Sequence, residues 1–304
     1  MSLIEPTGPS RATPAEPGIA DIAQARPMRT EIWRRFRRNK LAVVGLVFLV
    51  VVILCAVFAP LIAPYGFAER PVPRVYRGSP SAAHWFGTDG IGRDMFSRVI
   101  YGARVSLKVG ILATTLSLSI GVMLGAVAGF FGGLLDTIVM RLTDVFLSIP
   151  YIILAVAIAT LFGRSEGSII IVLGLTGWLA ITRIVRATVL SLKELEYVET
   201  ARALGLSRWR ILTRHVLPNV LQPIIVYGII SVGTVILAEA ALSFLGVGPQ
   251  DPTPAWGLMV AQGKGDLVNA SHLLFFPGGA IFLTMLAFVL VGDGLRDALD
   301  PRLR

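Results

Sequence analysis

Six long runs of apolar residues, nearly free of charge, follow one another along this chain. A helix needs about twenty predominantly apolar residues to cross the hydrocarbon core of a membrane. The runs are continuous and lack the alternation of lipid-facing strands, so the pattern favours helices over a β-barrel. We therefore predict an all-α integral membrane protein with six transmembrane helices at residues 41–59, 109–131, 145–162, 168–182, 221–245 and 273–291, the third kinked at Pro150.

Composition agrees with this pattern. Of the 304 residues, 54% are apolar and only 15% are charged, whereas about a quarter of a soluble domain is charged. A water-soluble globule is therefore nearly excluded. The net charge is +9, from 28 Lys and Arg against 19 Asp and Glu. On so apolar a chain, this excess indicates first the inner membrane surface, and nucleic acid is the weaker alternative.

The basic residues also predict the orientation, because short loops rich in Lys and Arg stay in the cytosol. Residues 29–40 hold six basic residues and one acid, and residues 183–214 hold seven basic residues. We expect both segments, and both chain termini, to be cytosolic. Residues 64–104 oppose the pattern: they should face outside, yet hold six arginines against three acids. A large ordered insert would tolerate this charge.

Four segments organise the chain. Residues 1–28 are rich in Pro, Ala and Thr and predict a disordered cytosolic tail. Residues 29–103 combine an interfacial helix with Trp33 and Phe36, the first span and an extracytoplasmic segment. Residues 104–297 hold spans two to six, and residues 298–304 form a cytosolic C-terminus.

Signatures of metal or catalytic chemistry are absent from the sequence. The single cysteine, Cys55, lies in an apolar run, and His84, His215 and His272 lie far apart without metal-ligand spacing. No GxxxxGK[ST], HExxH or SxxK motif occurs. We expect a chain that is not an enzyme, holds no metal or cofactor, and depends on another subunit for energy.

Glycines and charges within the predicted spans suggest specific contacts. Gly121, Gly125 and Gly129 recur every fourth residue, so they share one helix face. This spacing predicts close helix packing, with a glycine-lined substrate path as the alternative. Before the third run, Arg141 and Asp144 are three residues apart and are expected to pair.

Glu239 is the acid deepest in a predicted span. It follows the uncharged residues 219–238 and should lie toward the outer end of the fifth helix. An unpaired charge in hydrocarbon costs several kcal/mol, so this side chain should face protein or a water-filled cavity. We consider two roles for Glu239, a pathway or gate residue and an interhelical hydrogen bond.

The loop between spans four and five carries the strongest signal. Residues 195–219 read LEYVETARALGLSRWRILTRHVLPN. Helix formers up to Leu204, a stop at Gly205 and a second helix from Arg208 predict two short helices around a sharp turn. Pro218 closes this second helix or kinks the entry to span five. This predicted pair of helices, with its mixed apolar and basic surface, suits docking into a groove of a partner protein.

This loop resembles the EAA loop of binding-protein-dependent ABC importer permeases, in which an EAA triplet precedes a glycine and a closing Leu-Pro. Thr200 replaces the second residue of the triplet, and His215 stands where Ile is frequent. The resemblance implies that the loop couples the chain to an ATPase. The implied coupling residues are Glu199, Thr200, Ala201, Leu204, Gly205, Leu217 and Pro218.

A second resemblance narrows the family. HWFGTDGIGRDMFSRVIYGARVSL at 84–107, LAEAALSFLGVG at 237–248 and GDGLRDALDPRLR at 292–304 are similar to the C-type permeases for dipeptides, oligopeptides and nickel. From the residues themselves, the glycines of the first segment interrupt regular structure. Asp89, Arg93 and Asp94 should tie the resulting turn by hydrogen bonds and ion pairs.

The resemblance implies a type I ABC importer permease fold and one half of a peptide channel that works by alternating access. It implies a B-type sister permease, two cytosolic ATPase subunits that hold ATP and Mg, and an extracytoplasmic substrate-binding protein, all at the bacterial cytoplasmic membrane. A nickel-chelate or other small-solute importer is the alternative. A secondary transporter is less favoured, because the spans hold few central acids and no obvious repeat of broken helices.

Overall fold

The computed structural model describes residues 28–71, 73 and 75–299. The predicted disordered tail, apart from Met28, and the last five residues lie outside this part of the chain. The described elements are helical, with one isolated bridge between Thr88 and Asp94. The predicted all-α class is confirmed.

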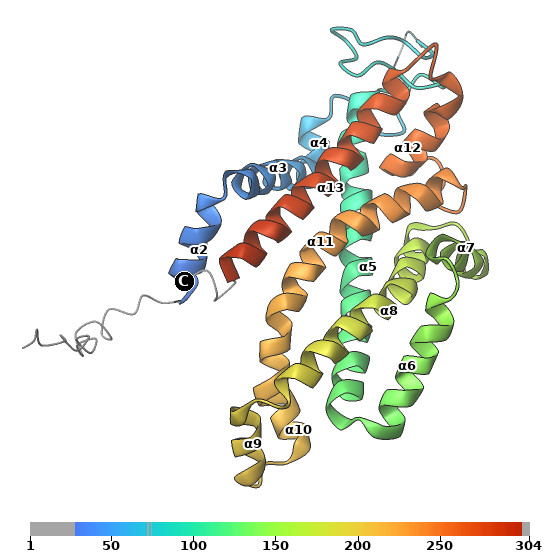
Figure 1. Cartoon of the computed structure of the whole chain (residues 1–304). Helices are drawn as coiled ribbons and strands as arrows, with labels where there is room; N and C mark the ends of the chain where they lie inside the picture. Colours follow the sequence, from blue (N-terminus) through green and yellow to red (C-terminus); the bar gives the residue numbers. More distant parts are fainter. Residues whose placement is uncertain (1–27, 72, 74, 300–304) are drawn as a thin grey trace, which may run out of the picture.

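The helices follow the chain in an order that alternates long spans with short connecting elements (Figure 1). Their bounds are α2 Met28–Arg38, α3 Lys40–Val57, α4 Ala59–Ile62, α5 Met95–Phe131, α6 Gly133–Leu147, α7 Tyr151–Phe162, α8 Glu166–Leu192, α9 Glu196–Ala203, α10 Arg208–Ile211, a π-helical turn Leu212–Val216, α11 Leu217–Phe244, α12 Trp256–Gly263, a 3₁₀ turn Lys264–Asp266 and α13 His272–Leu299.

Five helical segments in the described residues are long and apolar enough to cross a membrane, and α6 with α7 makes a sixth span if the bent pair counts as one. Several helices extend beyond the predicted runs. α5 starts at Met95 and not at residue 109, and α8 continues to Leu192 and not 182. The predicted runs end where charged residues begin, at Arg104, Lys108 and Arg183. The helices α5 and α8 continue through these charged residues.

The third span differs most from its prediction. It is not one kinked helix over 145–162 but two helices, α6 and α7, bent by 94°. Pro150 occupies the N-cap of α7 and has no N–H to donate, so α7 cannot continue the hydrogen-bond ladder of α6. α6 starts at Gly133. It contains charged residues, so it is not part of an uncharged apolar run and was not predicted as a span.

The predicted pairing of Arg141 with Asp144 is wrong. Asp144 instead accepts a hydrogen bond from Arg183 of α8 at 2.5 Å. One turn of α8 later, Arg186 donates two hydrogen bonds to Asp136, near the start of α6. These pairs cross between helices, and therefore hold α6 against α8 at two levels.

The glycine face of α5 packs against α8. A Cβ atom built on Gly121, Gly125 or Gly129 would lie 2.6, 2.6 or 3.0 Å from the nearest atom of α8. For Gly125 and Gly129 that atom is a backbone carbonyl oxygen. The two backbones thus approach as closely as only glycine allows, which is how small residues stabilise membrane helix pairs.

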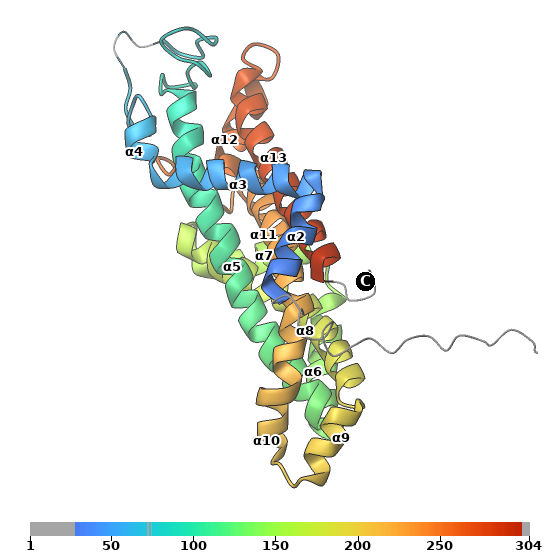
Figure 2. The same cartoon turned by 90° about the vertical axis from the view of Figure 1, so that its left-hand side faces the viewer.

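The two ends of the elongated molecule carry different structures. Figures 1 and 2 both show α9 and α10 at one end and the connection before α5 at the other, beside the beginning of α13. α3 crosses α13, and α2 packs near its C-terminal part, where Phe36 is buried beside Gly294. α5 is long enough to run between the two ends (Figure 2).

We predict that Gly125→Val destabilises the protein, because the new side chain would overlap Thr182 and Val185 on α8. Overpacking of this kind costs about 1–3 kcal/mol. The thermal unfolding midpoint of the detergent-purified protein measures the effect. Gly278→Ala is the matched control, since no atom lies within 4 Å of a Cβ at Gly278. Equal midpoints for both variants would contradict the close contact.

Candidate functional site

The EAA-like segment forms a hairpin of two short helices, α9 and α10, which project from one end of the bundle (Figures 1 and 2). We call this hairpin, residues 195–218, the coupling hairpin. Its turn ends α9 by a Schellman motif: the Leu206 N–H donates to the Ala201 carbonyl at 3.2 Å, and the Gly205 N–H donates to Arg202 at 3.0 Å. Gly205 has φ +76°, the left-handed conformation that glycine adopts without strain.

The inner face of the coupling hairpin is apolar and buried. Val198 and Ala201 of α9 and Ile211 of α10 form one cluster with Val185 and Val189 of α8. Ala126 of α5 and several residues of α11 belong to the same cluster. The hairpin is therefore fastened to the ends of three spans by burial of apolar area, the dominant favourable term in packing.

The outer face of the coupling hairpin is exposed. Leu204 at the turn is 75% exposed and Trp209 is 59% exposed, and Glu199 and Thr200 also face outward. The Trp209 ring meets Phe131, the last residue of α5, edge to face at 5.3 Å. A projecting tip with exposed Leu and Trp beside arginines is the kind of surface that another protein covers.

Pro218 does not end the second helix. A π-helical turn at Leu212–Val216 joins α10 to α11, and Pro218 stands in the first turn of α11, where a missing N–H is tolerated. Asn219 donates a hydrogen bond to the His215 carbonyl at 2.7 Å. The second helix of the hairpin and the fifth span thus form one continuous helical path.

A cavity lies where the third span is broken. It has a volume of about 430 Å³, and residues of α5, α8 and α11 line it together with the α6–α7 break. Hydroxyls contribute the polar part of its wall, and none of its described lining residues is Asp, Glu, Lys, Arg or His. The described part of the wall therefore presents hydroxyl groups and apolar surface, with no charged side chain.

Glu239 does not line this cavity. Its side chain is fully buried in the packed helices, where the Ser243 hydroxyl donates to Oε1 at 2.7 Å and Oε2 has no partner among the described residues. A pathway or gate role for Glu239 stays a prediction, and the transport rate of Glu239→Gln tests it.

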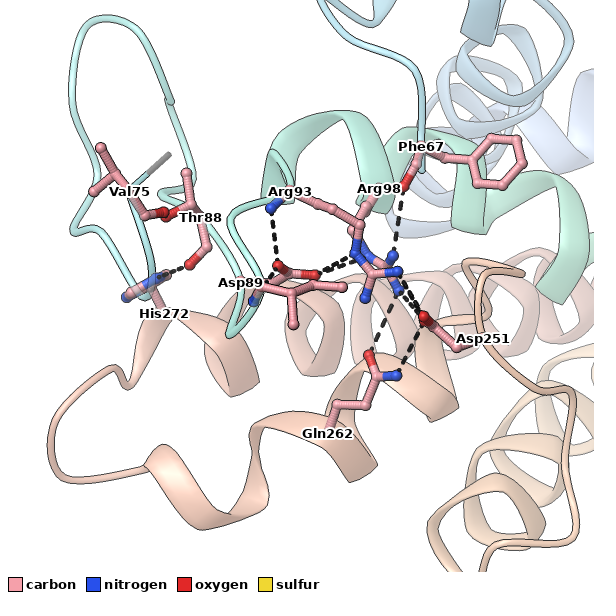
Figure 3. A network of polar contacts seen from close by, with 10 residues as sticks. Phe67, Val75, Thr88, Asp89, Arg93, Arg98, Asp251, Gln262 and His272 are labelled. Carbon is pink, nitrogen blue, oxygen red and sulfur yellow. Dashed lines mark hydrogen bonds and ion pairs between the residues drawn. The ribbon is translucent and has the colours of Figure 1, made fainter. Parts of the chain in front are cut away.

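At the opposite end, an ion-pair network ties the connection before α5 to the loop before α12 (Figure 3). Asp89 accepts hydrogen bonds from Arg93 Nε at 2.6 Å and from the Arg93 backbone N–H at 2.9 Å. Arg93 Nη1 also lies 2.8 Å from Asp251 Oδ2. Arg93 is buried, so its two acidic partners compensate for the loss of water.

Arg98, one turn into α5, extends the network. It is 1% exposed; Nη1 points to the Phe67 carbonyl at 3.4 Å and Nη2 to Gln262 at 3.5 Å (Figure 3). Nη2 also lies 3.6 Å from Asp251.

Burial alone would raise the pKa of Asp251, but hydrogen bonds from Arg93 and Gln262 and the charges of both arginines hold this pKa below its ordinary value. The stabilisation is therefore complete at neutral pH and declines as the pH falls through that lowered pKa.

Asp94 begins α5. Its carboxylate accepts the Ser97 N–H at 2.8 Å, an N-cap bond, and lies 2.8 Å from His84 Nδ1. The turn predicted for Asp89, Arg93 and Asp94 thus has the expected ties. Sequence reasoning missed Asp251 because a loop distant in sequence supplies it, and it missed Arg98 because only the folded structure shows that this side chain is buried. One signal in the sequence could have indicated this network. Residues 64–104 hold more arginines than acids, so some of these arginines need acidic partners from other parts of the chain.

We predict that Asp89→Asn lowers the thermal unfolding midpoint strongly, because it leaves Arg93 buried with a single ionised partner. Removing one partner of a buried pair costs about 3–5 kcal/mol. Asp266→Asn is the matched control, since it breaks a pair with the half-exposed Arg77 and should cost about 1 kcal/mol or less. Equal thermal unfolding midpoints for Asp89→Asn and Asp266→Asn would contradict a stabilising role of the ion-pair network.

Comparison with known proteins agrees with this geometry. A sequence model of the N-terminal TM domain of oligopeptide transport permease C matches residues 28–77. A second, of the binding-protein-dependent transport system inner membrane component, matches residues 121–304. The chain belongs to this family of ABC importer permeases. The coupling hairpin lies within the second match, and so does the cavity wall apart from Thr114 and Ser117. The ion-pair network joins residues before this match to residues inside it.

Individual relatives cover nearly the whole permease. The chain is 43% identical over 274 residues, 90% of each protein, to the dipeptide transport system permease protein DppC of Alkalihalophilus pseudofirmus. It is 43% identical over 290 residues, 95% of each, to the glutathione transport system permease protein GsiD of Pectobacterium atrosepticum. The GsiD protein of Escherichia coli O157:H7 is 43% identical over 281 residues, 92% of this chain. The protein is thus a multi-pass membrane permease subunit, and its family implies ATPase and binding-protein partners.

Proposed function

We propose that this permease is one half of the channel of an ATP-driven importer that moves short peptides into the cytosol by alternating access. The observation that carries the proposal is the coupling hairpin, which is exposed at its tip, buried at its base and continuous with α11. A self-sufficient carrier has no use for such a tip. The names of the relatives, dipeptide and glutathione permeases, support a peptide substrate.

The proposed assembly contains a B-type sister permease, two cytosolic ATPase subunits and an extracytoplasmic substrate-binding protein. ATP and Mg bind to the ATPase subunits, and this chain holds no cofactor. We place the assembly in the bacterial cytoplasmic membrane with the coupling hairpin and both termini in the cytosol. The basic residues of the hairpin and of α2 support this orientation, and the ion-pair network then lies outside.

In the proposed mechanism, an ATPase groove holds Leu204 and Trp209 at the tip of the hairpin. Closure of the ATPase pair on ATP displaces the tip, and the buried face passes this displacement to the ends of α5, α8 and α11. These helices also line the cavity at the broken third span. Movement at the tip thereby changes which side of the membrane the cavity faces, while the network keeps the outer loops together.

We predict that Gly205→Pro abolishes ATP-dependent uptake but leaves membrane insertion intact. Proline is fixed near φ −65° and has no N–H, so it can neither adopt φ +76° nor donate to Arg202. Gly205→Asn is the matched control, because Asn tolerates the left-handed conformation. Uptake of a labelled peptide by vesicles that hold the assembled importer measures both variants.

The same variants test the partners. Gentle detergent purification of the tagged wild-type chain should recover a second permease and P-loop ATPases in stoichiometric amount. Gly205→Pro should lose the ATPases, and Gly205→Asn should keep them. Normal uptake by Gly205→Pro would refute the coupling role, and a chain that purifies alone and transports without ATP would indicate a secondary carrier.

A further inference from the structure

A cavity at the base of the coupling hairpin has a wall that carries mostly positive charge. Its volume is about 570 Å³, within the range of small-ligand sites. The ends of α5 and α8 meet the hairpin there (Figure 1). The charged residues of its wall are Lys193, Arg202 and Arg208 against one acid, Glu194. We call it the basic cavity; Leu204, at the tip of the hairpin, is not part of its wall.

The three basic residues of this wall lack acidic partners. None of them forms an ion pair within the described part of the chain, and neither does Glu194. The two arginines that precede Lys193 on α8, by contrast, each pair with an acid of α6. Like charges gathered around one space repel one another. An anion placed between Lys193, Arg202 and Arg208 would turn this repulsion into attraction.

Backbone carbonyl groups hold two of these side chains at the cavity. Lys193 Nζ donates to the Gly129 carbonyl at 3.3 Å, and Arg202 Nη2 donates to the Lys193 carbonyl at 3.3 Å. Each bond uses one donor of a head group that has three in lysine and five in arginine. Lys193 is half-buried, and Arg202 and Arg208 are exposed. Donors of all three residues are therefore available to a ligand that enters the cavity.

We propose that the basic cavity binds a phosphate group, carried by an anionic lipid headgroup or by a soluble phosphate ester. Phosphate offers several acceptor oxygens, and an arginine pairs with two of them at once. Lys193 follows α8, Arg202 lies on α9 and Arg208 begins α10. The bound phosphate thus joins the end of a span to both helices of the coupling hairpin.

The rest of the wall favours a lipid as the source of the phosphate. Phe130, Phe131, Leu206 and Ile211 give the cavity an apolar side, and α5, a candidate membrane span, ends there. Anionic lipids concentrate in the cytoplasmic leaflet, and basic pockets between helices on that side bind their headgroups. This lipid source rests on the proposed cytosolic placement of the hairpin, whereas the phosphate site itself does not.

The test measures binding to the complete importer in a neutral detergent, with phosphatidylglycerol and inorganic phosphate as probes in separate titrations. Arg202→Gln and Arg208→Gln should each weaken binding roughly tenfold, the effect of one hydrogen bond to a charged group. We expect this loss for phosphatidylglycerol, which would assign the site to a lipid. The same loss for inorganic phosphate alone would support the phosphate site and assign it to a soluble ester.

Arg210→Gln is the matched control, because it removes the same charge from α10 at an exposed position outside the cavity wall. Both probes should bind to it as to the wild type.

Three results would overturn the phosphate site. The first is unchanged binding of both probes in Arg202→Gln and Arg208→Gln, and the second is equal weakening by Arg210→Gln. The third is loss of the ATPase subunits from the two wall variants, since the basic residues would then serve protein docking. Peptide import is measured separately by uptake, so the first two results would leave the proposed function intact.

Discussion

The close backbone contact between α5 and α8 is the constraint on which the rest of the structure depends. Three glycines at four-residue spacing allow it, because two of them face backbone carbonyls of α8 where a Cβ would not fit. Small residues are the usual means of joining helices in lipid, where apolar surfaces alone give little preference for a partner. The cross-helix pairs of Asp136 and Asp144 add α6 to the same unit.

This unit joins the two ends of the molecule. α5 begins at the N-cap of Asp94 inside the ion-pair network and ends at Phe131, against Trp209 of the coupling hairpin. The same helix carries Thr114 in the wall of the cavity between these ends. A single helix therefore contacts the loops of the ion-pair network, the cavity and the coupling hairpin, an arrangement that suits the proposed conversion of an ATPase motion into access for a solute.

Much of this arrangement could be predicted from the sequence, because its signals are local. Apolar runs predict spans, the left-handed glycine ends α9, and the glycine spacing defines one packing face, whose partner only the structure identifies. The rest depends on contacts between distant residues. Charged residues concealed α6, since their partners lie on α8, and the pairing of Arg93 with Asp251 joins loops more than a hundred residues apart. The cavity likewise forms only when α5, the α6–α7 break, α8 and α11 come together, so it could not be predicted from any one of these segments.

The central claim is that the coupling hairpin and α5 move as one body. Cys55 is the chain's only cysteine, so a Cys55→Ser background accepts spin labels at Ala203 of α9 and Met123 of α5, both exposed. The distance between the two labels is measured by pulsed electron paramagnetic resonance in the complete importer, without nucleotide and with ATP and vanadate. We predict the same distance in both states, while the mobility of the Ala203 label reports the bound ATPase. A nucleotide-dependent change in this distance would show that the hairpin pivots on its own, and would contradict the account.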